Sequence, residues 1–264
     1  VEHIDLRVPR FPNADVDLRK LRAWTHSLVS LSLTTFGFKS LAVPAKGKYL
    51  SRLIKLDLEH VDLDRAVAGG SEEEGFAKLS RLVSMARLEE LRLSSVRLHA
   101  RSCAELARLL PASLAALDLS RNQIGDKGIE LLAPSLNALT RLTRLNVSGN
   151  ELQDEGFAKV VASVHAGLRA LDASQNDVGK VSQAALPRLT KLTSLSLAEN
   201  GLGGAEVEGL LGALAGCDEL AALDLSSNVL ETSVVASSLR CIQQHASLRF
   251  FNGMPVTSRS GHYD

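Results

Sequence analysis

Apolar and polar residues alternate in short segments that return along the whole chain. Residues 114–124 show the pattern most clearly, as Leu-x-x-Leu-x-Leu-x-x-Asn-x-Ile. Alternation about Leu117 and Leu119 turns one side of a short strand inward and the other toward solvent. A glycine-rich turn follows at 125–128, and apolar residues then continue at helical spacing over 129–136. Each segment therefore predicts a strand, a turn and a helix.

The strand phrase occurs ten times, and its first apolar positions are Val1, Leu28, Leu53, Leu88, Leu114, Leu142, Leu168, Leu192, Leu220 and Leu248. The spacings are 24 to 28 residues, except for one of 35 residues. A unit of this length is too small to bury its own apolar face, so it must stack on its neighbours. We therefore expect parallel strands, each returned by an outer helix. The long spacing contains small and acidic residues, which predict an inserted loop at about 64–75 before a helix at about 76–85.

Asparagine recurs where the chain leaves most of the strands, at positions 122, 150, 176, 200 and 228. A buried amide is costly unless its donors and acceptors are paired. We expect each asparagine to bond the backbone of its own loop and of the adjacent loop. The first repeats carry Phe36, Val61 and Val96 at this place, which favours apolar packing of those loops.

The repeated phrase, the period near 28 residues and the Gly-x-x-Gly turn before a full helix resemble the ribonuclease-inhibitor-like class of leucine-rich repeats. The resemblance covers essentially the whole chain. It implies an α/β solenoid shaped as a curved horseshoe, with about ten parallel strands on the concave face and helices on the convex face. It also implies one domain over 1–264 that recognises proteins through the concave face and the strand-to-helix loops.

The C-terminal phrase, at about 248–256, departs from the others. It contains Asn252-Gly253 followed by Pro255-Val256, and it is similar to the closing cap of several intracellular repeat proteins. A cap keeps the last apolar face from water. We expect the array to end here, with 257–264 as a tail. The chain opens inside a strand phrase, so we expect it to be a fragment of a longer protein.

Charge and cysteine content narrow the classes of partner. The chain has 30 basic and 30 acidic residues, so no net field recruits nucleic acid or an anionic membrane. Its apolar stretches are too short to insert into a bilayer. Cys103, Cys217 and Cys241 show no short pairing pattern, and the cysteine-rich caps of extracellular repeat proteins are absent. We expect buried reduced thiols in a cytoplasmic, intracellular protein.

The sequence contains no convincing catalytic or metal-binding pattern. Asp57, Glu59, Asp62 and Asp64 surround His60, but the glycine and the terminal glutamate of a calcium loop are missing. Solvated charges are the favoured interpretation of this run. Neither a His-x-x-x-His or Cys-x-x-Cys pair nor a nucleophile elbow occurs. We therefore expect no enzyme activity, cofactor, metal or small-molecule substrate.

The solvent-facing strand positions are where a partner is to be sought. In the second half they are mostly Asp and Ser, which are common default residues in the resembling family. The earlier repeats mix both charges across neighbouring strands, which can orient a protein contact. The candidate contact residues are Lys55, Asp57, Glu59, Glu90 and Arg92, extended by Arg121 and Arg144. The alternative is that these residues form an ordinary soluble surface.

The favoured function is a non-enzymatic scaffold or adaptor that binds a protein partner of unknown identity through its concave face and adjoining loops. One alternative is a regulator of a small GTPase, because the fold is similar to that of the activator of the nuclear-transport GTPase Ran. That family carries an acidic tail, whereas this chain ends in Ser-Arg-Ser-Gly-His-Tyr-Asp. Another alternative is a sensor or effector repeat domain of a larger immune or virulence protein.

Overall fold

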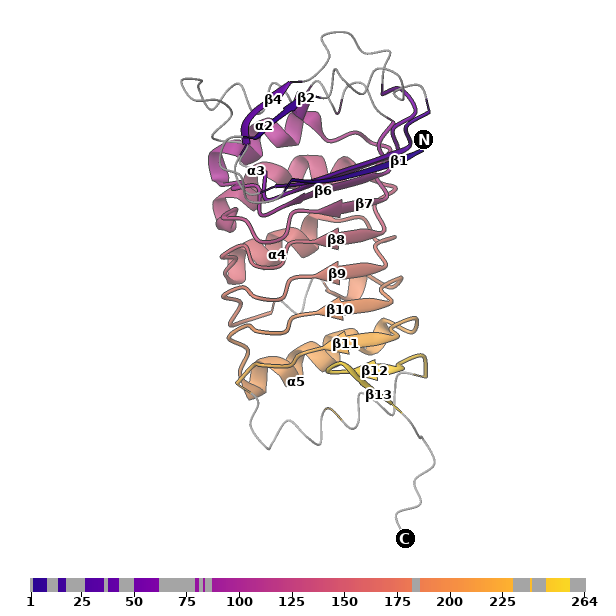
Figure 1. Cartoon of the computed structure of the whole chain (residues 1–264). Coiled ribbons are helices and arrows are strands. Elements are labelled where there is room, and N and C mark those ends of the chain that lie inside the picture. The colour runs from indigo at the N-terminus through magenta and orange to yellow at the C-terminus, as the bar shows by residue number, and fades with distance from the viewer. Residues whose placement is uncertain are drawn as a thin grey trace.

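Ten parallel strands lie side by side in one open, curved sheet in the computed structural model (Figure 1). The ten strands follow one another in the sheet in chain order, as the repeat predicts. The strands are β1 (His3–Val8), β3 (Ser30–Thr35), β5 (Lys55–Glu59), β6 (Glu90–Ser94), β7 (Ala116–Asp118), β8 (Arg144–Asn146), β9 (Ala170–Asp172), β10 (Ser194–Ser196), β11 (Ala222–Asp224) and β12 (Phe250–Phe251). The predicted α/β solenoid is confirmed.

The structure describes residues 2–8, 14–17, 27–35, 38–42, 50–61, 79–80, 83, 87–181, 186–229, 238 and 246–256. The predicted inserted loop at 64–75 and the tail at 257–264 lie outside these residues, as do Phe36 and Cys241. From the helix predicted over 76–85, Leu79 and Val83 are described, and both are helical and buried.

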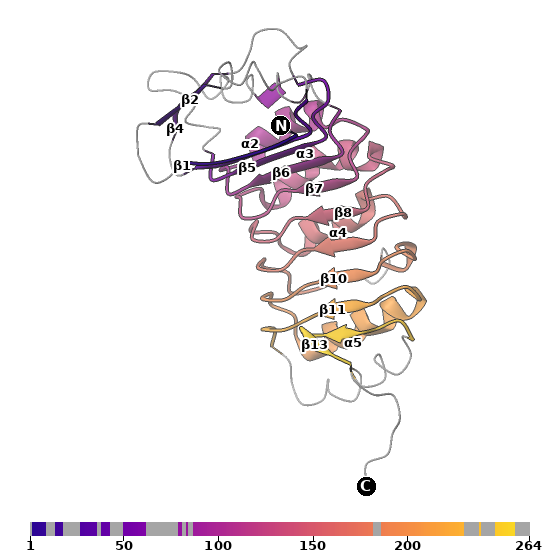
Figure 2. The same cartoon turned by 45° about the vertical axis from the view of Figure 1, so that its right-hand side comes forward.

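Helices cover the face of the sheet opposite the groove described below. They are α2 (Ala100–Leu109), α3 (Gly125–Ala138), α4 (Asp154–Ser163) and α5 (Gly204–Ala213), with short 3-10 turns η2 (Leu186–Arg188) and η3 (Leu214–Gly216). Figure 2 shows the α-helices stacked behind the strands in chain order. The core between the two layers contains the apolar face of every described helix. A smaller parallel pair consists of β2 (Ala14–Asp17) and β4 (Phe38–Ala42).

The core is a continuous row of leucines, because the strands pair in register. Leu56, Leu91, Leu117, Leu145 and Leu171 are successive partners along the sheet, and each is at most 2% exposed. In a strand, neighbouring side chains point to opposite faces. The positions on either side of each leucine therefore face away from the core, on the concave side.

The turn predicted at 125–128 is the first turn of α3 instead. Gly125 adopts the left-handed conformation, with φ of 57°, so the chain reverses at this single residue. Asp126 then lies in the first helical turn, where a carboxylate is favoured by the helix dipole. A four-residue glycine turn was therefore the wrong interpretation of this segment.

The asparagines form a ladder along the strand ends, as predicted. The amide nitrogen of Asn122 donates to the carbonyl oxygens of Leu93, Leu119 and Ser120. Its Oδ1 accepts from the backbone N–H groups of Val96 and Leu98, both at 3.0 Å. The amide donors recur in the same manner at Asn150, Asn176, Asn200 and Asn228.

One rung of the ladder differs from the others. The side-chain oxygen of Asn150 is buried and has no hydrogen-bond partner among the described residues. The backbone N–H of Gly125 instead donates to the backbone oxygen of Asn150, at 2.9 Å. In the first repeats, Val61 and Val96 are buried in place of the asparagine, as expected.

The sheet closes at the C-terminal side with a tight hairpin. β12 pairs antiparallel with β13 (Met254–Pro255), and the connecting Asn252 and Gly253 both have positive φ angles, 50° and 74°. The Oδ1 of Asn252 accepts from the backbone N–H of Leu225, at 2.8 Å. The side chain of Asn252 thus accepts a bond that the preceding strands give to a backbone oxygen of the next strand, as Leu197 does to Asp224. Among the described residues, no helix has the length and apolar character needed to span a bilayer.

Candidate functional site

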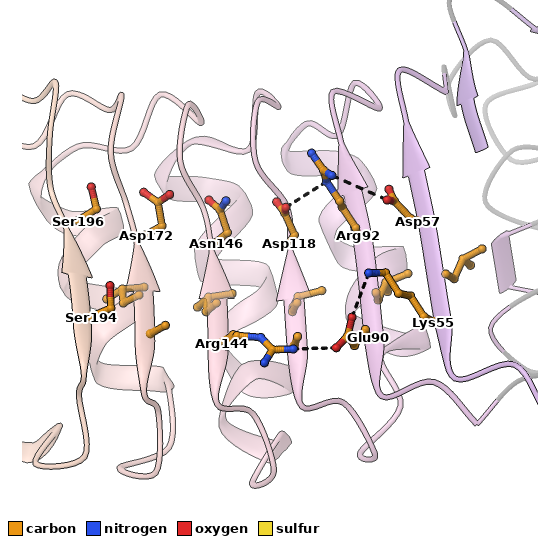
Figure 3. Close-up of a pocket in the computed structure, with 17 residues that line it drawn as sticks. Lys55, Asp57, Glu90, Arg92, Asp118, Arg144, Asn146, Asp172, Ser194 and Ser196 are labelled. Atoms are coloured by element: carbon orange, nitrogen blue, oxygen red, sulfur yellow. Dashed lines mark hydrogen bonds and ion pairs between the residues drawn. The ribbon is translucent and has the colours of Figure 1, made fainter. Parts of the chain in front are cut away.

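A groove of about 380 Å³ lies on the concave side of β5 to β10 (Figure 3). Two straight rows of side chains border it, because strand positions on either side of each buried leucine are in register. We call them the first row, which is Lys55, Glu90, Ala116, Arg144, Ala170 and Ser194, and the second row, which is Asp57, Arg92, Asp118, Asn146, Asp172 and Ser196.

The charged residues of the first row converge on one carboxylate. Glu90 forms an ion pair with Lys55, whose Nζ is 3.3 Å from Oε2. It also accepts a hydrogen bond from Arg144, whose Nη2 is 2.7 Å from Oε1. Arg144 reaches Glu90 across β7, whose residue in this row is Ala116. The small methyl group of Ala116 leaves room for the arginine side chain, and Ala170 leaves space on its other side.

The second row has the opposite arrangement, with three carboxylates around one guanidinium. Arg92 places Nη1 3.8 Å from Asp57 Oδ2, Nη2 3.5 Å from Glu59 Oε1 and Nε 3.2 Å from Asp118 Oδ2. The Nε has no hydrogen bond among the described residues, so its contact with Asp118 is an ion pair with poor angular geometry. Arg92 is therefore surrounded by three carboxylates, although one of its N–H donors, at Nε, makes no hydrogen bond with them.

Asp57 is the most perturbed acid of the groove. Its side chain is 15% exposed, and its Oδ1 is buried with no hydrogen-bond partner among the described residues. Burial raises the pKa of Asp57 above its ordinary value, and the nearby positive charge of Arg92 opposes this effect. Asp57 is thus largely removed from solvent at the wall of the groove.

Several second-row residues, and Asp224 at the same position of β11, also have a structural role. Asp118, Asp172 and Asp224 each accept a hydrogen bond from the backbone N–H of the residue two positions later, at 2.9 to 3.0 Å. Asn146 does the same for Ser148, at 2.9 Å. The short polar side chains of the later repeats are thus explained by local turns at the strand ends.

The structure brings six of the seven predicted contact residues together in the two ion-pair clusters, which are Lys55, Asp57, Glu59, Glu90, Arg92 and Arg144. The seventh, Arg121, lies on the loop after β7 with a φ of 56°. It is exposed and borders the polar continuation of the groove beside Arg92 and Asp118. Whether any of the seven contacts a partner stays a prediction.

The predicted contact set left out seven residues of the two rows, which are Ala116, Ala170, Ser194, Asp118, Asn146, Asp172 and Ser196. Asp118 was set aside as a default residue of the fold, yet it is one of the three carboxylates around Arg92. Ala116 and Ala170 occupy solvent-facing strand positions of the later repeats, which were set aside as uninformative. The available signal was that charged residues and alanines alternate at one position of successive repeats. This pattern predicts charged side chains with free space between them on the concave face.

Other chemistry is sparse in the described part of the chain. No three of its His, Cys, Asp and Glu side chains form a group that could hold a metal ion. Cys103 and Cys217 are buried and free, and burial raises the pKa of the Cys103 thiol to about 12. Such a thiol stays protonated at neutral pH and is a poor nucleophile. The groove is suited to polar recognition by paired charges.

Similarity to known proteins points to the same fold. A family model described as "Leucine Rich repeat" matches residues 112–133 and 138–160. The human protein named NACHT, LRR and PYD domains-containing protein 12 is 41% identical over 99 residues, which cover 35% of this chain and 9% of that protein. The chain therefore spans only a small part of this relative's length.

Two bacterial structures are similar in fold along most of the chain. An internalin (inlF) from Listeria monocytogenes superposes with a TM-score of 0.53 at 18% identity, covering 90% of this chain and 70% of that one. An internalin C2 (inlC2) from the same species gives a TM-score of 0.56 at 21% identity, covering 87% and 82%. Proteins built from these repeats generally mediate protein–protein interactions. The repeats, the parallel sheet and these similarities together make the chain a leucine-rich repeat protein.

Proposed function

We propose that this protein is a non-enzymatic interaction scaffold that binds a protein partner through the concave groove and its bordering loops. The observation that carries the proposal is the pair of ion-pair clusters, which hold seven charged side chains of β5, β6, β7 and β8 around one groove. Exposed ion pairs contribute only about 0 to 1 kcal/mol each to stability, so stability alone is a weak reason for such a cluster.

Charge arranged in this way serves selectivity. Complementary charges across an interface orient the partner and exclude wrong partners. A stable interface buries about 800 Å² on each side, which is more than the groove alone provides. We therefore include the loops after the strands, where Arg121 lies, in the binding surface.

The proposal is tested by capture from the native source followed by measured affinity. The identified partner is titrated against the wild-type chain and against Asp57→Lys/Glu59→Lys/Arg92→Glu. We expect the charge reversals to weaken binding by about tenfold or more, because each replaces an attraction with a repulsion. Circular dichroism checks that the variant is folded.

A matched control exchanges charges far from the groove. Lys127 and Glu130 form an exposed pair on α3, with Nζ 2.8 Å from Oε2. Lys127→Glu/Glu130→Lys reverses two charges on the helical side without changing the net charge, and it should leave the affinity unchanged. A partner that responds to the α3 exchange and ignores the groove variant would place the contact on the helices.

A single-turnover GTP hydrolysis assay with a panel of small GTPases separates this proposal from regulation of a GTPase. The scaffold proposal expects hydrolysis at the intrinsic rate for every member of the panel. Acceleration of any member by a catalytic amount of the chain would contradict it.

We also propose that the protein works in the reducing cytoplasm. The supporting observation is that Cys103 and Cys217 are free, buried and located in different repeats. Imaging of a fluorescent fusion in the native cell, together with thiol titration of the unfolded chain, tests this. Secretion with oxidised cysteines would contradict the proposal.

A further inference from the structure

Strand β6 carries two residues of opposite charge, and each is surrounded by an excess of the opposite sign. Glu90 and Arg92 are two positions apart on the strand and point to the same face, about 7 Å from each other. Glu90 is held by two cations, Lys55 and Arg144, so this cluster has a net charge of +1. Arg92 is held by three carboxylates, those of Asp57, Glu59 and Asp118, so this cluster has a net charge of −2.

The two clusters do not cancel each other. Among the described residues, the ion pairs of the first row stay within it, and those of Arg92 stay with the second row and Glu59. Figure 3 shows the two sets of contacts at separate heights on the sheet. The concave wall therefore presents a positive centre where β6 has a glutamate and a negative centre where β6 has an arginine.

We infer that the groove accepts an extended segment of the protein partner that carries an acidic and a basic side chain two positions apart. The acidic side chain lies against Lys55 and Arg144, and the basic one lies against Asp57, Glu59 and Asp118. This inference rests on the proposed protein binding and deepens it by giving the chemistry of the partner. In an extended chain, side chains at i and i+2 share one face about 7 Å apart, which is also the spacing of the Glu90 and Arg92 positions along β6.

The space beside Arg144 favours the same kind of occupant. Ala116 and Ala170 flank this arginine in the first row, so the wall is hollowed where the segment would lie.

Partners of a single charge fit the groove poorly. A polyanion such as nucleic acid is attracted by the first row and repelled by the second, and a polycation meets the reverse. Like charges brought together across an interface are strongly unfavourable, so the pattern selects against both.

The test is selection from a displayed library of random linear peptides on the immobilised chain, followed by sequencing. We expect enrichment of an acidic and a basic residue separated by one position, in either order, over same-sign pairs. The best enriched peptide is then synthesised together with a copy in which both charges have the same sign. The same-sign copy should bind about tenfold more weakly.

Three variants identify the surface involved. Lys55→Ala/Arg144→Ala should abolish the preference for an acidic residue and keep that for a basic one. Ala116→Trp fills the hollow and should abolish groove binding altogether. The matched control is Arg169→Ala/Lys191→Ala, because these residues form the same two-cation clamp on Glu219, at 3.4 and 2.6 Å, outside the groove. The control should keep the wild-type enrichment.

Each outcome decides the inference. Peptides that depend on Ala116 but lack paired opposite charges would overturn the bipolar specificity and leave the proposed scaffold function standing. The absence of any peptide sensitive to Ala116→Trp would also overturn it, because the groove would then not accept an extended segment. The capture experiment with the native partner decides the proposed function independently.

Discussion

Asn122 connects three stretches of backbone through one side chain. It bonds groups on the strand of the preceding repeat, on the preceding loop and on its own loop. It is 6% exposed, so water cannot replace these partners in full. At the residue scale, this paired amide therefore stabilises the repeat in addition to the burial of its leucines.

Replacing Asn122 with alanine should lower the free energy of unfolding by about 2 to 4 kcal/mol, because several buried backbone groups lose their partner. Urea denaturation followed by circular dichroism measures this. The matched control is Asn137→Ala, at an exposed position of α3 in the same repeat, which should leave the stability unchanged or raise it slightly, because alanine is the better helix former. An equal loss in both variants would show that the ladder has no special role.

Asp57 makes a distinct contribution to the dependence of stability on pH. Its pKa is raised in the folded chain by burial, so the folded state binds this proton more tightly than the unfolded state does. The stabilising contribution is complete below the unfolded pKa of about 3.9 and is lost as the pH rises through the folded pKa. The ionised carboxylate is therefore a cost of the folded groove at neutral pH.

Asp57→Asn removes this titration. We expect the stability of the variant relative to wild type to increase as the pH rises from acid to neutral, in urea denaturation at a series of pH values. The opposite trend would mean that the attraction of Arg92 outweighs burial.

At the scale of elements, α3 and α4 meet at a glycine. A side chain at Gly156 of α4 would collide with the carboxylate of Asp126 in α3. The same carboxylate accepts a hydrogen bond from the backbone N–H of Gln153, at 2.8 Å, just before α4 begins. The close approach therefore lets one helix cap the start of the next.

Gly156→Ala should destabilise the chain by about 1 to 3 kcal/mol through overpacking. Shortening the obstructing side chain in the double variant Gly156→Ala/Asp126→Ala should recover part of this loss, although the cap on Gln153 is removed. Thermal or urea unfolding of the four members of the cycle gives the coupling energy. Strict additivity would contradict a direct collision.

Elements differ in how well the sequence predicts them. The strands were predictable because every repeat has the same leucine spacing, and a slip of one residue would turn its apolar face to water. The turn before α3 was not, because one left-handed glycine performs what a four-residue turn was expected to do. The groove was predictable as a set of charges but not as two clusters, because the contact of Arg144 with Glu90 depends on the size of Ala116.

At the scale of the whole molecule, the ion-pair clusters should influence binding more than folding. Lys55, Glu90 and Arg144 have side chains 48%, 37% and 58% exposed, so solvent and salt screen their interactions. Raising the salt concentration to about 0.5 M should change the unfolding free energy by less than about 1 kcal/mol. It should slow association with the native partner by about tenfold, measured by stopped flow, because charge steers the encounter. A salt-independent association rate would contradict electrostatic steering.

The hairpin of β12 and β13 also bears on self-association. An exposed strand edge invites pairing with another molecule and so promotes aggregation. β13 runs against the other strands, and Pro255 lacks an amide hydrogen, so this edge is a poor template for a second copy of the sheet. A backbone hydrogen bond from the N–H of Val256 to the carbonyl oxygen of Arg249, at 2.8 Å, holds the hairpin closed. If the hairpin were opened, the edge of β12 would be exposed and could pair with a second molecule, which would promote fibre formation.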